Sequence, residues 1–151
     1  PTGTMILRTL EGKMKNYWDG GVCAVDVRDV AAGHVLAMEK GRIGESYILA
    51  NKDGNMPNKE LLTMIGKIAG VSNVAQTEVS GNVMLRVAKF AEMWSKISGR
   101  APITTYKNTR YVLQHGYVDP AKAVQELGLP QTPIETAVAD SVKWFRDNGY
   151  A

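Results

Sequence analysis

The stretch from Val22 to Ala50 constrains the fold more than any other part of the sequence. Val22–Val27 (VCAVDV) is apolar and rich in β-branched residues, so it is predicted to form a buried strand. Asp29 follows where an N-cap belongs, before a helical pattern that a lysine and a glycine close near residue 41. Ser46–Ala50 (SYILA) is predicted as a second short strand. A strand, a capped helix and a strand form the crossover unit of a parallel sheet.

Most of the remaining sequence has helical patterns with clear start and stop signals. Helices are predicted over Thr4–Glu11, 57–69, Asn82–Ser98, Thr105–Leu113, 120–127 and 133–148, and a third short strand over Thr77–Val79. A few short strands cannot build a doubly wound sheet, so further strands are expected elsewhere. The predicted fold class is α/β: a helix-rich portion of a Rossmann-type protein, with a few short parallel strands and most of the main sheet missing.

Three side chains are predicted to be structural caps. Asp29 precedes the helix of the crossover unit, and Asp119 precedes a proline that suits the first helical position. Thr132 opens the sequence Thr-Pro-Ile-Glu, which has the spacing of a capping box. Asp29 lies three residues after Asp26, but the predicted strand and cap positions argue against a catalytic pair of carboxylates.

Composition and charge exclude several classes of function. The formal charge is +3, and lysine and arginine are scattered between acidic residues without a clustered basic face, so no nucleic-acid partner is expected. Cys23 is the single cysteine, which excludes an internal disulfide and a cysteine-rich zinc site and suits a reducing, cytoplasmic location. His34 and His115 are isolated, so no metal site is expected, and His34 is predicted to be packed and hydrogen-bonded. No apolar run approaches the roughly 20 residues that cross a bilayer.

The common signatures of nicotinamide chemistry do not occur in these 151 residues. The nearest approach to a glycine-rich phosphate-binding turn is Gly41-x-x-Gly44, which has no third glycine. No tyrosine is followed by lysine four residues later; Tyr106 has Arg110 there instead, and a guanidinium does not replace a compact ammonium. We therefore expect neither catalytic nor cofactor-binding residues in this chain.

Three segments, in order, resemble a known family. They are VDVRDVAAGH (25–34) continuing to Met38-Glu39, GESYIL (44–49), and DPAKA (119–123) with the following ELG, PIE and WF motifs up to Phe145. Together they are similar to the carboxyl-terminal half of the extended short-chain dehydrogenase/reductases, the NAD-dependent epimerase/dehydratases. Hopanoid-associated sugar epimerases and dihydroflavonol-reductase-like proteins are the most similar groups. The resemblance covers nearly the whole chain and is weakest from Val71 to Arg110.

The resemblance implies an amino-terminal dinucleotide-binding domain that carries the glycine-rich turn, the Tyr/Lys pair and the bound NAD or NADP. This chain would then supply the substrate-binding carboxyl-terminal portion and would be inert by itself. Thr2 and Gly3 would follow the substrate loop, and with Val25 and Asp26 they are expected to form a wall of the substrate pocket. Because the sequence starts with a proline directly before a helical pattern, truncation is favoured over processing.

The resemblance leaves the substrate and the reaction open among epimerase, dehydratase and reductase. Many family members that use nucleotide sugars place an arginine just ahead of the strand that Val22-Cys23-Ala24 occupies here. Its absence favours a smaller or more apolar small-molecule substrate. The alternative is a non-enzymatic binding or regulatory protein on the same scaffold, and a homodimer of the complete protein is also left open.

Overall fold

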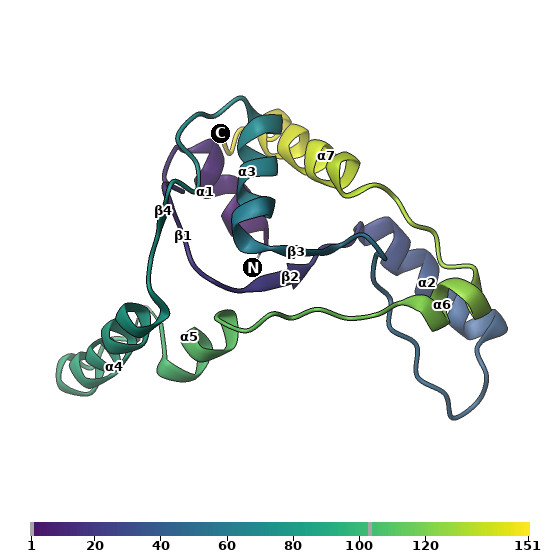
Figure 1. Ribbon diagram of the computed structural model, residues 1–151, viewed down its shortest axis with the longest axis horizontal. Coiled ribbons are helices and arrows are strands. Elements are labelled where there is room, and N and C mark those ends of the chain that lie inside the picture. The colour runs from purple at the N-terminus through teal and green to yellow at the C-terminus, as the bar shows by residue number, and fades with distance from the viewer. Residues whose placement is uncertain (1, 103) are drawn as a thin grey trace.

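The protein is described by a computed structural model, which places residues 2–102 and 104–151. The elements are α1 (Thr2–Leu10), β1 (Asn16–Tyr17), β2 (Gly21–Cys23), α2 (Val27–Lys40), β3 (Asn55–Pro57), α3 (Asn58–Ala69), β4 (Thr77–Glu78), α4 (Gly81–Ser98), α5 (Tyr106–Val112), α6 (Ala121–Leu127) and α7 (Ile134–Asp147). Figure 1 shows three groups: α1, α3 and α7 together, α2 beside α6, and α4 beside α5. The helix-rich α/β prediction is confirmed.

The main core lies among α1, α3 and α7. Apolar residues of α3 recur at helical spacing, so Leu61 and Ile65 fall on one buried face, while Leu62 packs on the other side against Met14. Opposite them, α1 contributes Ile6 and α7 contributes Ile134, Val138 and Val142. Each such side chain stabilises the fold by about 1.5–3 kcal/mol relative to an exposed one. This core holds α1 and α7 side by side.

The strands pair differently from the predicted crossover. Of the described strands, β1 pairs with β4 in parallel, with Asn16 opposite Thr77. In contrast, β2 pairs antiparallel with β3, with Val22 opposite Met56. The parallel crossover over Val22–Ala50 is therefore wrong for the described structure.

Two of the predicted strands in this region also need correction. The strand predicted over Val22–Val27 ends at Cys23, because Asp26 caps a helix that already begins at Val27. Ser46–Ala50 is extended but belongs to no strand of the described structure, since no described backbone pairs with it. Leu49 of this segment packs instead in the cluster formed by α2 and α6.

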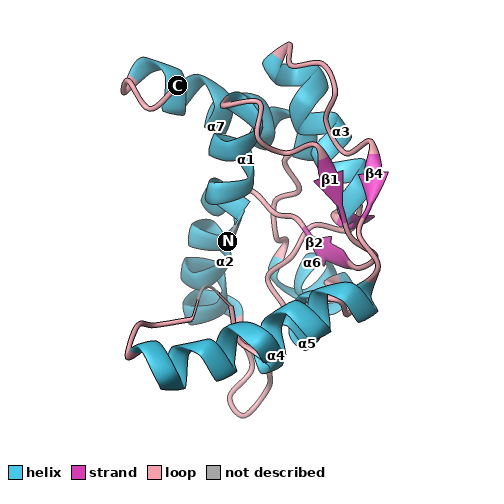
Figure 2. Ribbon diagram, turned by 90° about the vertical axis from the view of Figure 1, so that its left-hand side faces the viewer, coloured by secondary structure: helices cyan, strands magenta, loops and turns pink. Residues whose placement is uncertain are grey.

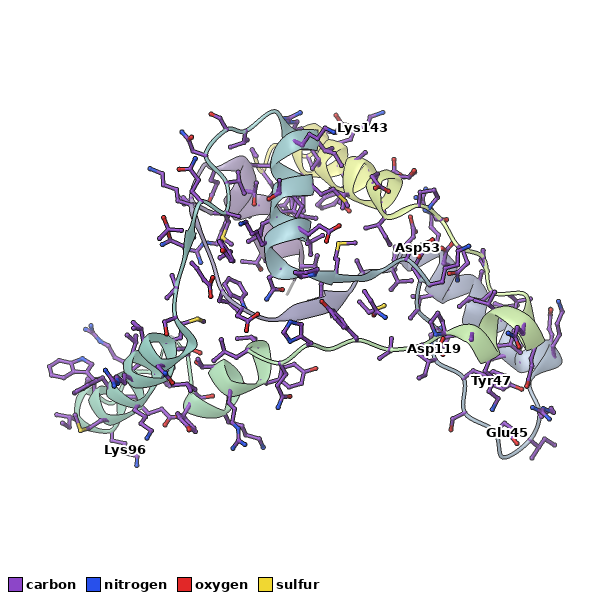
Figure 3. All side chains as sticks on the ribbon, in the orientation of Figure 1. Glu45, Tyr47, Asp53, Lys96, Asp119 and Lys143 are labelled. Carbon is purple, nitrogen blue, oxygen red and sulfur yellow. The ribbon has the colours of Figure 1, made fainter. Side chains whose placement is uncertain are left out.

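Because Gly33 has no side chain, residues 46–50 and the loop after α6 can approach α2 closely at that position. A Cβ atom added there would lie 2.7 Å from Leu129 Cδ1 and 2.8 Å from Leu49 Cδ2. Lys122 of α6 contacts Glu45, and Tyr47 donates a 2.8 Å hydrogen bond to Glu126, so polar contacts also fasten the 41–50 loop to α6 (Figure 3). The α2–α6 pair is therefore a second packed unit beside the main core.

Candidate functional site: a cavity between α1, the β2–α2 connection and α7

A cavity of about 530 Å³ lies where α1, the connection from β2 to α2, and α7 meet. Figure 2 shows α7, α1 and α2 following one another along one side of the molecule. The cavity is lined by all of the predicted wall residues, namely Thr2, Gly3, Val25 and Asp26. The fold thus brings together residues from the start of the chain and from positions more than twenty residues later.

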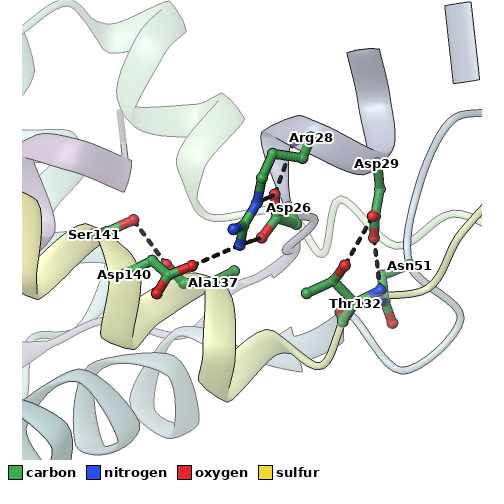
Figure 4. Close-up of polar contacts among 8 residues, drawn as sticks. All are labelled: Asp26, Arg28, Asp29, Asn51, Thr132, Ala137, Asp140 and Ser141. Atoms are coloured by element: carbon green, nitrogen blue, oxygen red, sulfur yellow. Dashed lines mark hydrogen bonds and ion pairs between the residues drawn. The ribbon is translucent and has the colours of Figure 1, made fainter. Parts of the chain in front are cut away.

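Asp26 is positioned by its place at the start of α2. It is the N-cap, and its carboxylate accepts a 2.8 Å hydrogen bond from the Arg28 backbone N–H. The Arg28 side chain turns back onto the same carboxylate, with Nε 2.9 Å from Oδ1. Its Nη2 also lies 2.6 Å from Asp140 of α7 (Figure 4). Arg28 therefore joins two carboxylates across the mouth of the cavity.

This arrangement sets the protonation of the two groups. The hydrogen bonds from Arg28 hold the pKa of the Asp26 carboxyl below its usual range, although burial opposes the shift. The same contacts with Asp26 and Asp140 raise the pKa of Arg28. At neutral pH the site therefore carries an ionised Asp26 carboxylate and a guanidinium whose Nε and Nη2 donors are engaged by Asp26 and Asp140.

Asp29 lies inside α2 instead of capping it, so the predicted cap is wrong. The helix starts at Val27, two residues before Asp29, which places Asp29 in the first turn, where the residue is 3% exposed. Its carboxylate accepts hydrogen bonds from the Thr132 backbone N–H at 2.6 Å and from the Thr132 hydroxyl at 2.8 Å. Asn51 donates to the Thr132 carbonyl at 2.8 Å. Asp29 and Asn51 thus fasten the segment that leads into α7 (Figure 4).

The two other predicted caps have different outcomes. Thr132 does not cap α7, because Pro133 holds the N-cap position and the Thr132 hydroxyl is bound to Asp29. Asp119 precedes the N-cap residue Pro120, yet its carboxylate accepts a 2.8 Å hydrogen bond from the Ala121 N–H. It therefore satisfies one of the free donors at the start of α6 from one position further out.

The cavity also includes side chains of α7 that the sequence did not single out. Ala137, Asp140, Ser141 and Trp144 recur at intervals of three and four residues, so they share one face of the helix and line the cavity. The neighbouring Phe145 lies edge-on to Trp144, with ring centroids 5.4 Å apart. The helical spacing of these residues could have predicted from the sequence that they share a face of α7. Only the packing of α7 shows that this face meets the cavity.

Cys23 reaches the cavity from the end of β2. Its thiol donates a 3.6 Å hydrogen bond to the Asn51 carbonyl. Burial raises the pKa of the Cys23 thiol, and the contact with Asn51 offsets only part of that effect. The group is therefore a protonated, weakly nucleophilic lining residue at neutral pH.

Other surfaces have less of the character of a site. A groove of about 810 Å³ runs along α3, but its walls are largely exposed side chains such as Lys59, Glu60 and Lys67.

Among the described residues, no three acidic, cysteine or histidine side chains gather in a way that would hold a metal. His34 is exposed, so its predicted packing is wrong, but its ring nitrogen Nδ1 is 2.8 Å from the Val30 carbonyl. Within the placed residues, no helix combines the length and apolarity needed to cross a bilayer.

No protein-family model matches the chain. A dihydroflavonol 4-reductase-like protein of Synechocystis sp. (strain ATCC 27184 / PCC 6803 / Kazusa) is 39% identical over 99% of this chain. That alignment covers 44% of the Synechocystis protein, so the chain spans less than half of this relative's length.

Solved structures are also matched over nearly all of this chain and over less than half of their own length. The crystal structure of gox2253 is 36% identical and superposes with a TM-score of 0.78 over 99% of this chain and 44% of its own. A nucleoside-diphosphate-sugar epimerase from Pseudomonas aeruginosa is 26% identical, with a TM-score of 0.70 over 99% of this chain and 43% of its own. The Bordetella bronchiseptica enzyme WbmF in complex with NAD+ shares the fold, at 23% identity and a TM-score of 0.60 over 97% of this chain and 36% of its own. In sequence and in fold, the chain matches the carboxyl-terminal half of the extended short-chain dehydrogenase/reductases, the NAD-dependent epimerase/dehydratases.

Proposed function

We propose that this chain is the substrate-binding part of an NAD(P)-dependent epimerase, dehydratase or reductase, and that the 530 Å³ cavity is its side of the substrate pocket. The observation that carries the proposal is the convergence of Thr2, Gly3, Val25 and Asp26 on one cavity. Ligand pockets are concave, mostly apolar and furnished with a few placed polar groups. This cavity has that character, with apolar walls and the Asp26–Arg28–Asp140 contacts at one side.

In the complete protein, an amino-terminal dinucleotide-binding domain would hold NAD or NADP. The nicotinamide would exchange hydride with a carbinol or carbonyl carbon of the substrate, and a Tyr/Lys pair on that domain would handle the proton. The relatives' coverage of 44% and the NAD+ complex of WbmF support this arrangement. The residues of the present chain would bind and orient the substrate and exclude water from it.

The cavity favours a compact substrate with an apolar body over a nucleotide sugar. A diphosphate is held best by a guanidinium that can face it with two parallel N–H donors, but Nε and Nη2 of Arg28 are already engaged by Asp26 and Asp140. Trp144 and Phe145 offer aromatic surface instead. Similarity to a dihydroflavonol-reductase-like protein agrees with a substrate of this kind.

The test is Val25→Trp in the protein at its natural length, with Val35→Trp as the matched control. Val25 lines the cavity, whereas Val35 is exposed on α2 outside it. The probes are dihydroquercetin with NADPH, as a carbonyl substrate, and UDP-glucose with NAD+, as a nucleotide-sugar substrate. Val25→Trp should lower kcat/KM for the accepted probe at least about tenfold. The dissociation constant for NADPH should stay unchanged, and Val35→Trp should behave as wild type.

Unchanged kcat/KM in Val25→Trp would show that substrate binds elsewhere. If the protein at its natural length turned over neither probe and bound no NAD(P)H, the result would favour the alternative of a non-enzymatic binding protein.

A further inference from the structure

The outer face of α4 carries an apolar stripe that is exposed in the described part of the chain, formed by Val83, Val87, Phe90, Trp94 and Ile97. These residues repeat at intervals of three and four, so they align along one side of the helix. Their exposed fractions reach 67% for Phe90, 69% for Trp94 and 74% for Ile97. The opposite side packs on α5 and includes the fully buried Ala88 and the half-buried Leu85. The most apolar face of this helix therefore points to solvent.

Positive charge is concentrated around this stripe. Residues 81–113 contain six of the chain's 18 lysines and arginines but only one of its 15 acidic residues. That acid, Glu92, is engaged, because its carboxylate accepts the Tyr106 backbone N–H at 2.9 Å. The expectation of evenly scattered charge is wrong for this segment.

The basic side chains flank the stripe on α4 itself. By helical spacing, Arg86 borders the stripe, and Lys89 and Lys96 lie further round the same side. Lys96 stands at the outer part of α4 in Figure 3. Arg100 lines a hollow of about 520 Å³ next to Phe90 and Trp94. Basic residues thus follow the apolar stripe along the helix.

We propose that α4 lies on an anionic lipid surface, with the stripe inserted at the boundary between headgroups and acyl chains. A helix with a tryptophan- and phenylalanine-containing apolar face and lysine and arginine beside it is the form that interfacial helices take. Each basic residue near an anionic leaflet adds about 1 kcal/mol of attraction. A second copy of the chain is disfavoured as the occupant, because pairing two such faces would bring together two segments that each carry this excess of positive charge. Figure 1 shows α4 at the edge of the described structure, away from α1, α3 and α7.

The test is flotation of the protein at its natural length with vesicles of phosphatidylcholine alone or mixed with phosphatidylglycerol. We expect binding to the mixed vesicles, little to the neutral ones, and loss at high salt. Phe90→Ser/Trp94→Ser should weaken binding at least about tenfold. Arg86→Gln/Lys89→Gln should weaken it about fivefold per charge. The control Met38→Ser/Ile43→Ser removes apolar side chains that are even more exposed, on another surface, and should leave binding unchanged.

Three results would overturn the proposal. One is wild-type protein that does not float with the mixed vesicles. Another is flotation that the Phe90→Ser/Trp94→Ser variant retains. The third is a wild-type protein that does not bind vesicles and sediments as a soluble dimer, while the Phe90→Ser/Trp94→Ser variant sediments as a monomer. That result would make the stripe a protein interface. Retention of the circular dichroism spectrum and melting temperature in each variant would show that α4 remains folded.

Discussion

Asp29 and Thr132 lie 103 residues apart in sequence and are joined by two hydrogen bonds, one to the Thr132 backbone N–H and one to its hydroxyl. This buried contact connects the first turn of α2 to the segment that leads into α7. Because α2 begins and α7 passes at the same cavity, the contact fixes two of its walls relative to each other.

Asp29→Ala is therefore expected to destabilise the fold through a lost tertiary contact. The substitution removes a charged acceptor and leaves a buried N–H without a partner, which costs about 2–3 kcal/mol. Thr132→Val removes only the hydroxyl and should cost about 1 kcal/mol. Chemical denaturation of the two single variants and the double variant measures the coupling. Additive single-variant effects would contradict a direct contact.

The Asp26–Arg28 contact predicts a specific acid dependence of stability. Since the pKa of Asp26 is lowered in the folded state, its contribution is fully present above the unfolded value of about 3.9 and is lost as pH falls through the folded pKa. Asp26→Asn keeps an N-cap acceptor but removes the charge. The variant should be less stable than wild type at neutral pH, and the gap should close in acid. A gap that persists unchanged at low pH would show that the charge of Asp26 is not the source.

Cys23 offers a chemical report on the cavity. Because burial raises its pKa, the thiol should react with iodoacetamide more slowly than a free cysteine at neutral pH, and unfolding should restore the normal rate. A substrate that fills the cavity should slow the reaction further. Mass spectrometry of the labelled peptide measures the rate. Labelling as fast as that of free cysteine would place the thiol outside a protected pocket.

The 151-residue chain alone should not bind nicotinamide cofactors appreciably. Its sequence contains no glycine-rich turn at a helix start, which is the usual cradle for a pyrophosphate. Calorimetric titration with NADH and NADPH checks this, and a circular dichroism spectrum establishes that the sample is folded. Low-micromolar affinity for either cofactor would mean that this portion carries a binding site of its own.

Local signals in the sequence determined the helices well. Gly70 and Gly99 follow α3 and α4 in the left-handed conformation that glycine adopts readily, and each ends its helix where the sequence predicted. Leu61 and Ile65, four residues apart, share a buried face of α3, as helical periodicity requires. These features depend on residues within one or two turns of each other, so sequence spacing is sufficient to detect them.

Tertiary structure decided which polar side chain meets which partner and which apolar face is covered. Asp26 and Asp29 both suit a helix start, and the choice between them depends on Arg28, Asp140 and Thr132, two of which lie more than 100 residues away. Ser46–Ala50 has the composition of a strand, but a strand exists only where another backbone supplies hydrogen bonds. The stripe on α4 has the periodicity of a core face and yet is exposed. Periodicity reports that a face is apolar, whereas burial depends on what the rest of the fold brings against it.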